Sequence, residues 1–282
     1  MELDSSVLAR TVEAALAEDL GEAGDITTDA VIDSGCRATG RFVAREELVL
    51  AGLPVAREVF RQLDAQLSFR ALRREGERIG AGECVAVVSG GARAILRGER
   101  TSLNFLMRMC GVARAADSAV AEVAGTGCVV LDTRKTAPGL RQLDKYATAC
   151  GGMTNHRMGL YDGVMVKDTH LDAGCGLEQA LRRLFERGHD RSIVTVEVRR
   201  PAELEQAIAG GAGRAILDNM DLDDLRRAVQ IGKGRIVLEA SGGLRPGLLR
   251  AVAETGVDCI SLGWITHSAP AANLALEMEG RP

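Results

Sequence analysis

The chain has 282 residues and a formal net charge of −4 at pH 7, and 46% of its residues are hydrophobic. This length suits one large α/β domain, or a barrel with a smaller companion domain. An acidic balance with only 3% aromatic residues argues against nucleic-acid binding. No stretch approaches the roughly 18 apolar residues of a membrane span, and charged residues interrupt the N-terminus, so we expect no membrane contact and no signal peptide. Seven scattered cysteines without a C-x-x-C pair indicate reduced thiols in a cytoplasmic protein.

The first part of the chain predicts a mixture of helices and strands. Apolar residues at helical spacing predict a helix over Ser6–Leu20, followed by a turn or cap at Asp25–Thr28. Cys36–Gly52 is strand-like, and Pro54–Leu63 reads as a helix with proline near its first turn. Short strands near 67–69 and 84–88 precede a long helix that begins near Ala92.

The pattern changes after Gly127, where short β-rich runs alternate with helical segments. The predicted strands are Cys128–Leu131, Gly163–Val166, Ile193–Val198, Ala215–Leu217, Arg235–Leu238 and Asp258–Leu262. The predicted helices between them are Leu177–Arg187, Pro201–Ala209, Asp221–Ile231 and Pro246–Glu254. Such alternation predicts a parallel sheet.

Each of these β-rich runs ends in a polar residue or a glycine. These residues are Asp132, Lys167, Glu197, Asp218, Glu239 and Gly263. The carboxyl ends of the strands of a (β/α) barrel meet at one mouth, where active sites are built. An open doubly wound sheet is the alternative, but no G-x-G-x-x-G follows the first of these strands. We therefore predict a barrel, which is incomplete if no further strand exists.

Five cations follow the apolar runs near this predicted mouth: Arg134, Lys135, His156, Arg157 and Lys167. Arginine offers a planar fork to carboxylate or phosphate, and lysine offers a point charge. Basic groups gathered on an acidic chain predict a site for a small polyanion, such as a phosphate ester or a polycarboxylate. A solvated charged loop is the alternative, and a Schiff-base lysine at either lysine position is a more distant one.

Three carboxylates occupy successive strand ends: Glu197, Asp218 and Glu239. A carboxylate at the end of a buried run is costly unless it is paired or bound to a metal. The three therefore indicate a Mg²⁺ site, contacts to sugar hydroxyls, or stabilisation of a developing cation. Structural ion pairs across the barrel mouth are the alternative.

Small residues follow the last two strands, at Ser241-Gly242-Gly243 and at Gly263. Barrels often bind phosphate in these loops through backbone N–H groups. An ordinary turn is the alternative for the Ser-Gly-Gly segment.

Several short motifs together resemble the quinolinate phosphoribosyltransferase family, and they occur in its order. They are Glu18-Asp-Leu-Gly, Gly24-Asp-Ile-Thr, Arg100-Thr-Ser-Leu-Asn, Asp132-Thr-Arg-Lys-Thr, Asn155-His-Arg, Lys167-Asp-x-His, Asp218-Asn, Glu239-Ala-Ser-Gly-Gly, Ile260-Ser-Leu-Gly and Thr266-His-Ser. Each motif is short, but the ordered set covers nearly the whole chain and is specific.

The resemblance implies both a reaction and an architecture. Quinolinate and phosphoribosyl pyrophosphate would give nicotinate mononucleotide, pyrophosphate and CO₂, with Mg²⁺, in NAD biosynthesis. The fold would combine an N-terminal α/β sandwich domain over 1–112 with an incomplete α/β barrel over 113–267, and the tail at about 268–282 could pack with the first domain. The family forms dimers or multiples of dimers with shared active sites.

The resemblance also implies roles for individual residues. Arg100, from the neighbouring subunit, and Arg134, His156 and Arg157 would hold the quinolinate carboxylates. Lys135 and Lys167 would act at the anionic end of either substrate as catalytic residues. Glu197 and Asp218 would contact the ribose or its Mg²⁺, with Glu239 as a further substrate-binding residue. Ser241, Gly242, Gly243 and Gly263 would hold the 5′-phosphate.

Four positions depart from the family pattern: Arg114, Met153, Thr169 and Thr195. None removes a charged residue of the predicted site. They leave open a paralogue of the molybdenum-locus type that uses another acid acceptor, and a non-catalytic anion-binding relative.

Overall fold

The computed structural model describes residues 2–279, and the chain divides into two compact units. The first unit takes the chain up to Asp117, the segment Thr136–Gly152 and the chain from Ile265 onward. The second unit consists of Ser118–Lys135 and Met153–Trp264. Among residues 2–279, no helix combines the length and the apolar character that crossing a membrane requires. All seven cysteines are free.

The first unit is built on an antiparallel sheet with the strand order β12-β1-β5-β3. Its strands are β1 (Arg37–Ala44), β3 (Ser68–Ala71), β5 (Cys84–Gly91) and β12 (Leu274–Met278). The strand from the C-terminal tail, β12, pairs with β1 in the register Phe42↔Leu276. A separate two-stranded sheet pairs β2 (Leu48–Val49) with β4 (Arg78–Ile79).

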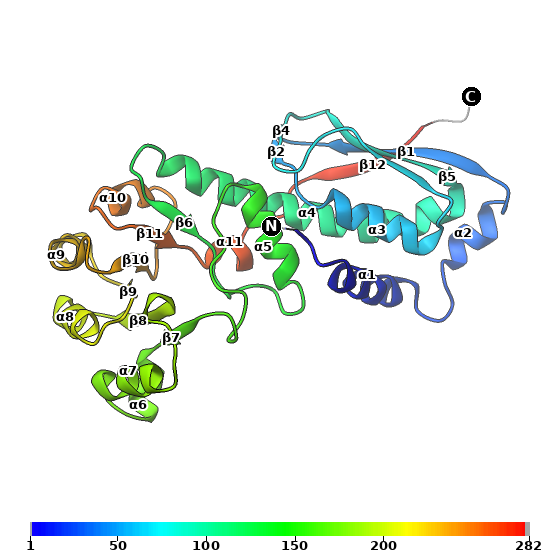
Figure 1. Ribbon diagram of the computed structural model, residues 1–282. Helices are drawn as coiled ribbons and strands as arrows, with labels where there is room; N and C mark the ends of the chain where they lie inside the picture. The colour runs from blue at the N-terminus through cyan, green and yellow to red at the C-terminus, as the bar shows by residue number, and fades with distance from the viewer. Residues whose placement is uncertain (1, 280–282) are drawn as a thin grey trace. The chain divides into compact units, whose positions relative to one another are not determined.

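Two helices pack against one face of this sheet, α3 (Leu53–Leu63) and the long α4 (Ala92–Glu122) (Figure 1). The core between them contains Phe42 from β1 and Phe60 from α3, whose rings meet edge to face at a centroid distance of 6.0 Å. Burial of such large rings is the main source of stability in a layer of this kind.

Three further helices lie in the first unit. They are α1 (Ser5–Leu20), α2 (Ile26–Val31) and α5 (Arg141–Cys150). Asp25 caps α2, since its carboxylate accepts a hydrogen bond from the backbone N–H of Thr28 at 2.9 Å. The predicted N-terminal helix and the predicted cap are thereby confirmed.

The second unit contains a six-stranded parallel sheet with the order β6-β11-β10-β9-β8-β7. The strands are β6 (Val129–Leu131), β7 (Val164–Val166), β8 (Val194–Val198), β9 (Arg214–Asp218), β10 (Val237–Ser241) and β11 (Cys259–Ser261). Each later strand lies beside its predecessor, and β6 adds to the free side of β11. This is the order of a barrel left open between β6 and β7, so the predicted fold class is confirmed.

Helices connect the strands of the second unit, as the alternating pattern predicts. They are α6 (Asp168–Ala173), α7 (Leu177–Glu186), α8 (Pro201–Ala209), α9 (Leu222–Gly232) and α10 (Leu249–Ala253), and a short 3₁₀ turn, η1 (Arg191–Ile193), precedes β8. A last short helix, α11 (Trp264–His267), follows β11. Figure 1 shows α7, α8, α9 and α10 in a row along the sheet.

Both boundaries of one predicted strand were wrong. The predicted strand Arg235–Leu238 places Glu239 just beyond its end, whereas β10 runs over Val237–Ser241 and Glu239 is its central residue. The strand continues through the carboxylate because the barrel interior provides it with charged partners, which are described below.

Candidate active site

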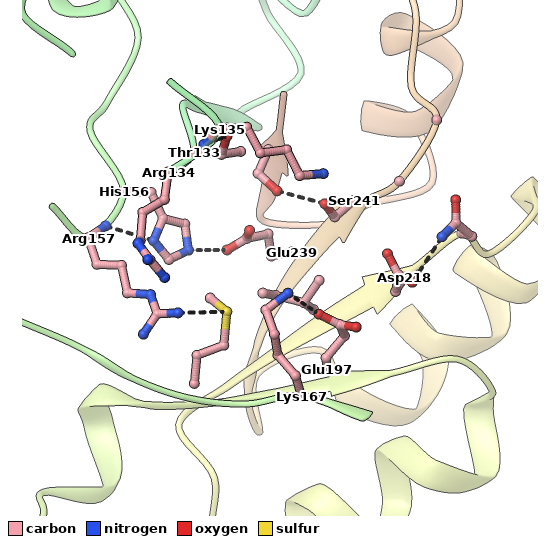
Figure 2. Close-up of a pocket in the computed structure, with 16 residues that line it drawn as sticks. Thr133, Arg134, Lys135, His156, Arg157, Lys167, Glu197, Asp218, Glu239 and Ser241 are labelled. Atoms are coloured by element: carbon pink, nitrogen blue, oxygen red, sulfur yellow. Dashed lines mark hydrogen bonds and ion pairs between the residues drawn. The ribbon is translucent and has the colours of Figure 1, made fainter. Parts of the chain in front are cut away.

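A pocket of about 640 Å³ opens in the second unit, at the carboxyl ends of the strands (Figure 2). The residues that line it are Thr133, Arg134, Lys135, His156, Arg157, Met165, Lys167, Glu197, Ile216, Asp218, Asn219, Glu239, Ser241, Gly242, Gly243 and Ser261. Figure 2 shows Arg134, His156 and Arg157 on one side of this pocket and Asp218 on the other.

The strands position this lining through simple alternation. Met165 and Lys167 are two residues apart at the end of β7, and Ile216 and Asp218 are two residues apart on β9. Successive side chains of a strand point to opposite faces, so alternate residues share the interior face of the barrel. Between the two pocket residues of β9, Leu217 is fully buried on the opposite face.

Arg134 and Arg157 form the cationic side of the pocket. Arg157 donates from Nη1 to the carbonyl of Gly163 at 2.8 Å. Burial lowers the pKa of Arg157, and the positive charge of Arg134 lowers it further, while Asp162 opposes both effects. The Nε of Arg134 is buried and makes no hydrogen bond within residues 2–279. Two close guanidinium groups with an unused buried donor are suited to receive an anion.

A buried carboxylate holds the loop that carries these cations. Asp132 follows β6 and is fully buried. It accepts hydrogen bonds from the side chain of Asn155 at 2.6 Å and from the backbone N–H of His156 at 2.8 Å. Asp132 therefore fixes the Asn155–Arg157 segment rather than facing a ligand.

His156 is held between the backbone and a second buried carboxylate. Its Nδ1 accepts the N–H of Arg157 at 2.7 Å, which places the proton of a neutral ring on Nε2. That Nε2 lies 3.4 Å from Oε2 of Glu239. The same oxygen accepts a hydrogen bond from Nη1 of Arg214 at 2.9 Å. Burial opposes ionisation of Glu239, but His156, Ser261 and Arg214 together hold its pKa below the ordinary value.

The lysine at the end of β7 pairs with the carboxylate of β8. Nζ of Lys167 donates to Oε2 of Glu197 at 2.8 Å, and the Glu197 side chain is only 11% exposed. The backbone N–H of Lys167 is capped by Nδ1 of His170 at 2.9 Å, at the start of α6. Hydrogen bonds thus hold both the side chain and the backbone N–H of Lys167.

The glycine loop after β10 lies against the end of β9. Gly242 and Gly243 adopt φ of 94° and 61°, a region that favours glycine. A Cβ on Gly242 would lie 2.4 Å from Oδ1 of Asn219. Asn219 itself has φ of 55°, and its Nδ2 donates to Oδ2 of Asp218 at 2.9 Å. Close approach of this backbone to Asn219 shapes the pocket wall that carries Asp218.

The structure brings most of the predicted site residues together in this pocket. Those that line it are Arg134, Lys135, His156, Arg157, Lys167, Glu197, Asp218, Glu239, Ser241, Gly242 and Gly243. Gly263 follows β11 and lies against Lys135, because a Cβ there would be 2.7 Å from Cδ of that lysine. Arg100 is an exposed residue of α4 in the first unit. Their predicted roles toward substrates stay predictions.

Six residues that build the site were given no role from the sequence, although Thr133, Asn219 and Ser261 stand inside the motifs quoted above. Five of them line the pocket: Thr133, Met165, Ile216, Asn219 and Ser261. The sixth, Arg214, pairs with Glu239 beneath the pocket. The two-residue period of a strand, counted back from Lys167 and Asp218, identifies Met165 and Ile216.

A metal at this site would depend on few protein ligands. No group of three or more His, Cys, Asp or Glu side chains within residues 2–279 is arranged to hold a metal ion. Glu197 and Asp218 are carboxylates of the pocket lining, and Glu197 is paired with Lys167 at 2.8 Å. Magnesium in phosphate sites is commonly held by one or two carboxylates together with substrate phosphates, and these two residues fit that donor set.

Fold and pocket together define an α/β-barrel enzyme with a site for a small polyanion. Two family models match the chain. The model of the quinolinate phosphoribosyl transferase N-terminal domain matches residues 25–110, and the model of the C-terminal domain matches residues 112–277. The chain belongs to the quinolinate phosphoribosyltransferase family. It is a pentosyltransferase that acts on small molecules.

Individual relatives are similar to the chain over most of its length. A chloroplastic nicotinate-nucleotide pyrophosphorylase (carboxylating) of Arabidopsis thaliana is 36% identical over 96% of this chain and 83% of its own. A probable enzyme of the same name from Bacillus subtilis is 38% identical over 93% and 90%. The solved nicotinate-nucleotide pyrophosphorylase of Francisella tularensis is 36% identical, with a TM-score of 0.92 over 99% of this chain and 98% of that one.

Proposed function

We propose that this chain is a carboxylating nicotinate-nucleotide pyrophosphorylase, in the biosynthesis of NAD. It transfers the phosphoribosyl group of phosphoribosyl pyrophosphate to the ring nitrogen of quinolinate. The products are nicotinate mononucleotide, pyrophosphate and CO₂. The relatives of that name, which are 36% to 38% identical over most of the chain, support this activity.

The single observation that carries the proposal is the division of charge within one pocket. Arg134 and Arg157 lie on one side, as a dicarboxylate requires, and Asp218 lies on the other. Paired guanidinium groups match the fork of a carboxylate. A positioned carboxylate suits a sugar that becomes positively charged during reaction.

The first step joins the ring nitrogen to carbon 1 of the ribose. The nitrogen lone pair forms the new bond, and the bond from carbon 1 to the pyrophosphate oxygen breaks. Positive charge develops on the sugar as pyrophosphate leaves, and the carboxylates of Asp218 and Glu197 stabilise it. Lys167 holds Glu197 in place at 2.8 Å, and Lys135 lies at the same mouth to meet an anionic group.

The second step removes the carboxylate from ring carbon 2. The carbon–carbon bond breaks, CO₂ leaves, and the electron pair stays on carbon 2, next to the positively charged ring nitrogen. A proton from solvent then completes the C–H bond. Arg134 and Arg157 position the ring so that the other carboxylate stays bound.

Further parts of the proposal concern the surroundings of the site. Mg²⁺ held by Asp218 and Glu197 would neutralise the pyrophosphate charge. The working form is a homodimer or a multiple of dimers, in which exposed Arg100 reaches the pocket of a neighbouring copy. The 5′-phosphate binds at Ser241, Gly242, Gly243 and Gly263, and the seven free cysteines fit a cytoplasmic location.

Product analysis tests the proposal. The purified chain receives phosphoribosyl pyrophosphate and Mg²⁺ with either quinolinate or nicotinate, and nucleotides are separated by chromatography. Nicotinate mononucleotide from quinolinate alone is the expected result. Nucleotide from neither acid, with the chain folded, contradicts the proposal and directs the search to another planar acid acceptor.

A further inference from the structure

Arg214 is a charged residue of the barrel interior that the proposed reaction does not use. It begins β9, and Ile216 and Asp218 follow it at alternate positions of the same strand. The latter two line the pocket, whereas Arg214 does not appear in its wall. Arg214 therefore lies toward the amino end of the strand, beneath the pocket floor.

The guanidinium of Arg214 neutralises Glu239, the most buried carboxylate of the pocket lining. Nη1 of Arg214 donates to Oε2 of Glu239 at 2.9 Å, and the Glu239 side chain is 1% exposed against 30% for Arg214. An ionised carboxylate at such depth is costly unless it is paired. Without this partner, Glu239 would also place an uncompensated negative charge beneath a site built for anions.

Glu239 in turn holds His156, and through it the backbone at Arg157. Oε2 of Glu239 lies 3.4 Å from Nε2 of His156, while Nδ1 accepts the Arg157 N–H at 2.7 Å. Both ring nitrogens are thus directed at groups of the chain itself. A partner on one nitrogen fixes which nitrogen carries the proton and how the ring is turned.

We infer that Arg214 is a positioning residue: acting through Glu239 and His156, it sets the place of Arg157 and thereby the binding of the acid acceptor. It touches no substrate in this account. The inference rests on the proposed function and adds a residue to it. Asp132 holds the same segment from the end of β6, so two buried carboxylates fix the segment, and Arg214 pairs with one of them, Glu239.

The groups that face Glu239 define how its ionisation responds to a change at Arg214. They are His156 from the segment after α5, Arg214 from β9, and Ser261 and Cys259 from β11. Burial favours the neutral carboxyl, and His156, Ser261 and Arg214 favour the carboxylate. Removal of the arginine charge therefore moves ionisation of Glu239 to higher pH. The acid limb of the kcat/KM profile should move to higher pH with it.

The test compares Arg214→Met with Arg214→Lys and with the control Arg226→Met. Arg226 pairs with Asp223 on the exposed surface of α9. We expect Arg214→Met to raise KM for quinolinate by about tenfold to a hundredfold, because small misplacements far from the chemistry have effects of this size. KM for phosphoribosyl pyrophosphate should stay within about twofold. The acid limb of kcat/KM should move to higher pH, Arg214→Lys should recover most of the loss, and Arg226→Met should resemble the wild type.

Several outcomes overturn the inference. An unchanged pH profile, an equal rise of KM for both substrates, or an Arg214→Lys as impaired as Arg214→Met would each assign Arg214 to stability alone. If Arg214→Met does not fold, Arg214→Gln takes its place. The acid limb of its kcat/KM profile should also move to higher pH, and an unchanged limb would contradict the inference. Absence of turnover in the wild type contradicts the proposed function instead. In that case, calorimetric titration with quinolinate at several pH values tests Arg214: Arg214→Met should bind quinolinate more weakly, its binding should be lost at higher pH than in the wild type, and Arg214→Lys should restore both.

Discussion

Gly242→Ala tests whether the close contact between Gly242 and Asn219 shapes the pocket, beyond the cost of the positive φ at Gly242. The added Cβ would lie 2.4 Å from Oδ1 of Asn219, where ordinary contact begins at 3.4 Å, so the amide must retreat by about 1 Å. Its hydrogen bond to Asp218 at 2.9 Å would then be lost. The positive φ of 94° adds a penalty of about 1–2 kcal/mol, and the lost hydrogen bond adds about 1 kcal/mol.

Gly247→Ala is the matched control, because Gly247 lies in the same loop with φ of 87° and open space around its Cβ position. Denaturant unfolding should find Gly242→Ala less stable than Gly247→Ala by about 1 kcal/mol. Turnover by Gly242→Ala should fall by about tenfold or more, while Gly247→Ala keeps its turnover. Equal stability and equal turnover of the two variants would refute the role given to the Gly242–Asn219 contact.

Four further predictions address the site and the assembly. Arg134→Ala should raise KM for quinolinate about tenfold or more and leave KM for phosphoribosyl pyrophosphate nearly unchanged, whereas equal losses contradict its role as a carboxylate ligand. Glu197→Gln should lower kcat by about a hundredfold with little change in either KM, as steady-state kinetics will show. Because the pKa of Glu239 is held below 4.5, its contribution to stability is present above pH 4.5 and lost as the pH falls through its folded-state pKa. Glu239→Gln should thus cost about 3 kcal/mol at pH 7 and less in acid, measured by denaturant unfolding. Mixed chains of Arg100→Ala and Lys167→Ala should regain activity that neither has alone, and no recovery after confirmed subunit exchange speaks against a shared site.

The barrel and its mouth could be predicted because both follow from short-range patterns. The alternation of β-rich runs with helical segments predicted the parallel sheet, and the polar residue at the end of each run marked its carboxyl end. Lys167 and Asp218 illustrate this, since each ends or directly follows a strand and lines the pocket. The resemblance to a family then assigned roles that spacing alone left open.

Tertiary contacts decided what could not be predicted. The interval between the first two barrel strands carries so many polar residues that α5 gave no helical signal, although Asp144 and Lys145 are fully buried. Asp144 is held by Arg108 through hydrogen bonds of 2.9 and 2.8 Å, a partner 36 residues away. Arg214 resembles an ordinary surface cation at the start of a strand, and only its pairing with Glu239 gives it a role.

The most direct test of the central claim is a single-turnover reaction with quinolinate labelled with ¹³C in its 2-carboxylate. Mass spectrometry would follow the label in nucleotide and in released gas. We predict one labelled CO₂ for each unlabelled nicotinate mononucleotide, and neither product without phosphoribosyl pyrophosphate. A nucleotide that retains the label, or CO₂ released without the second substrate, would contradict it.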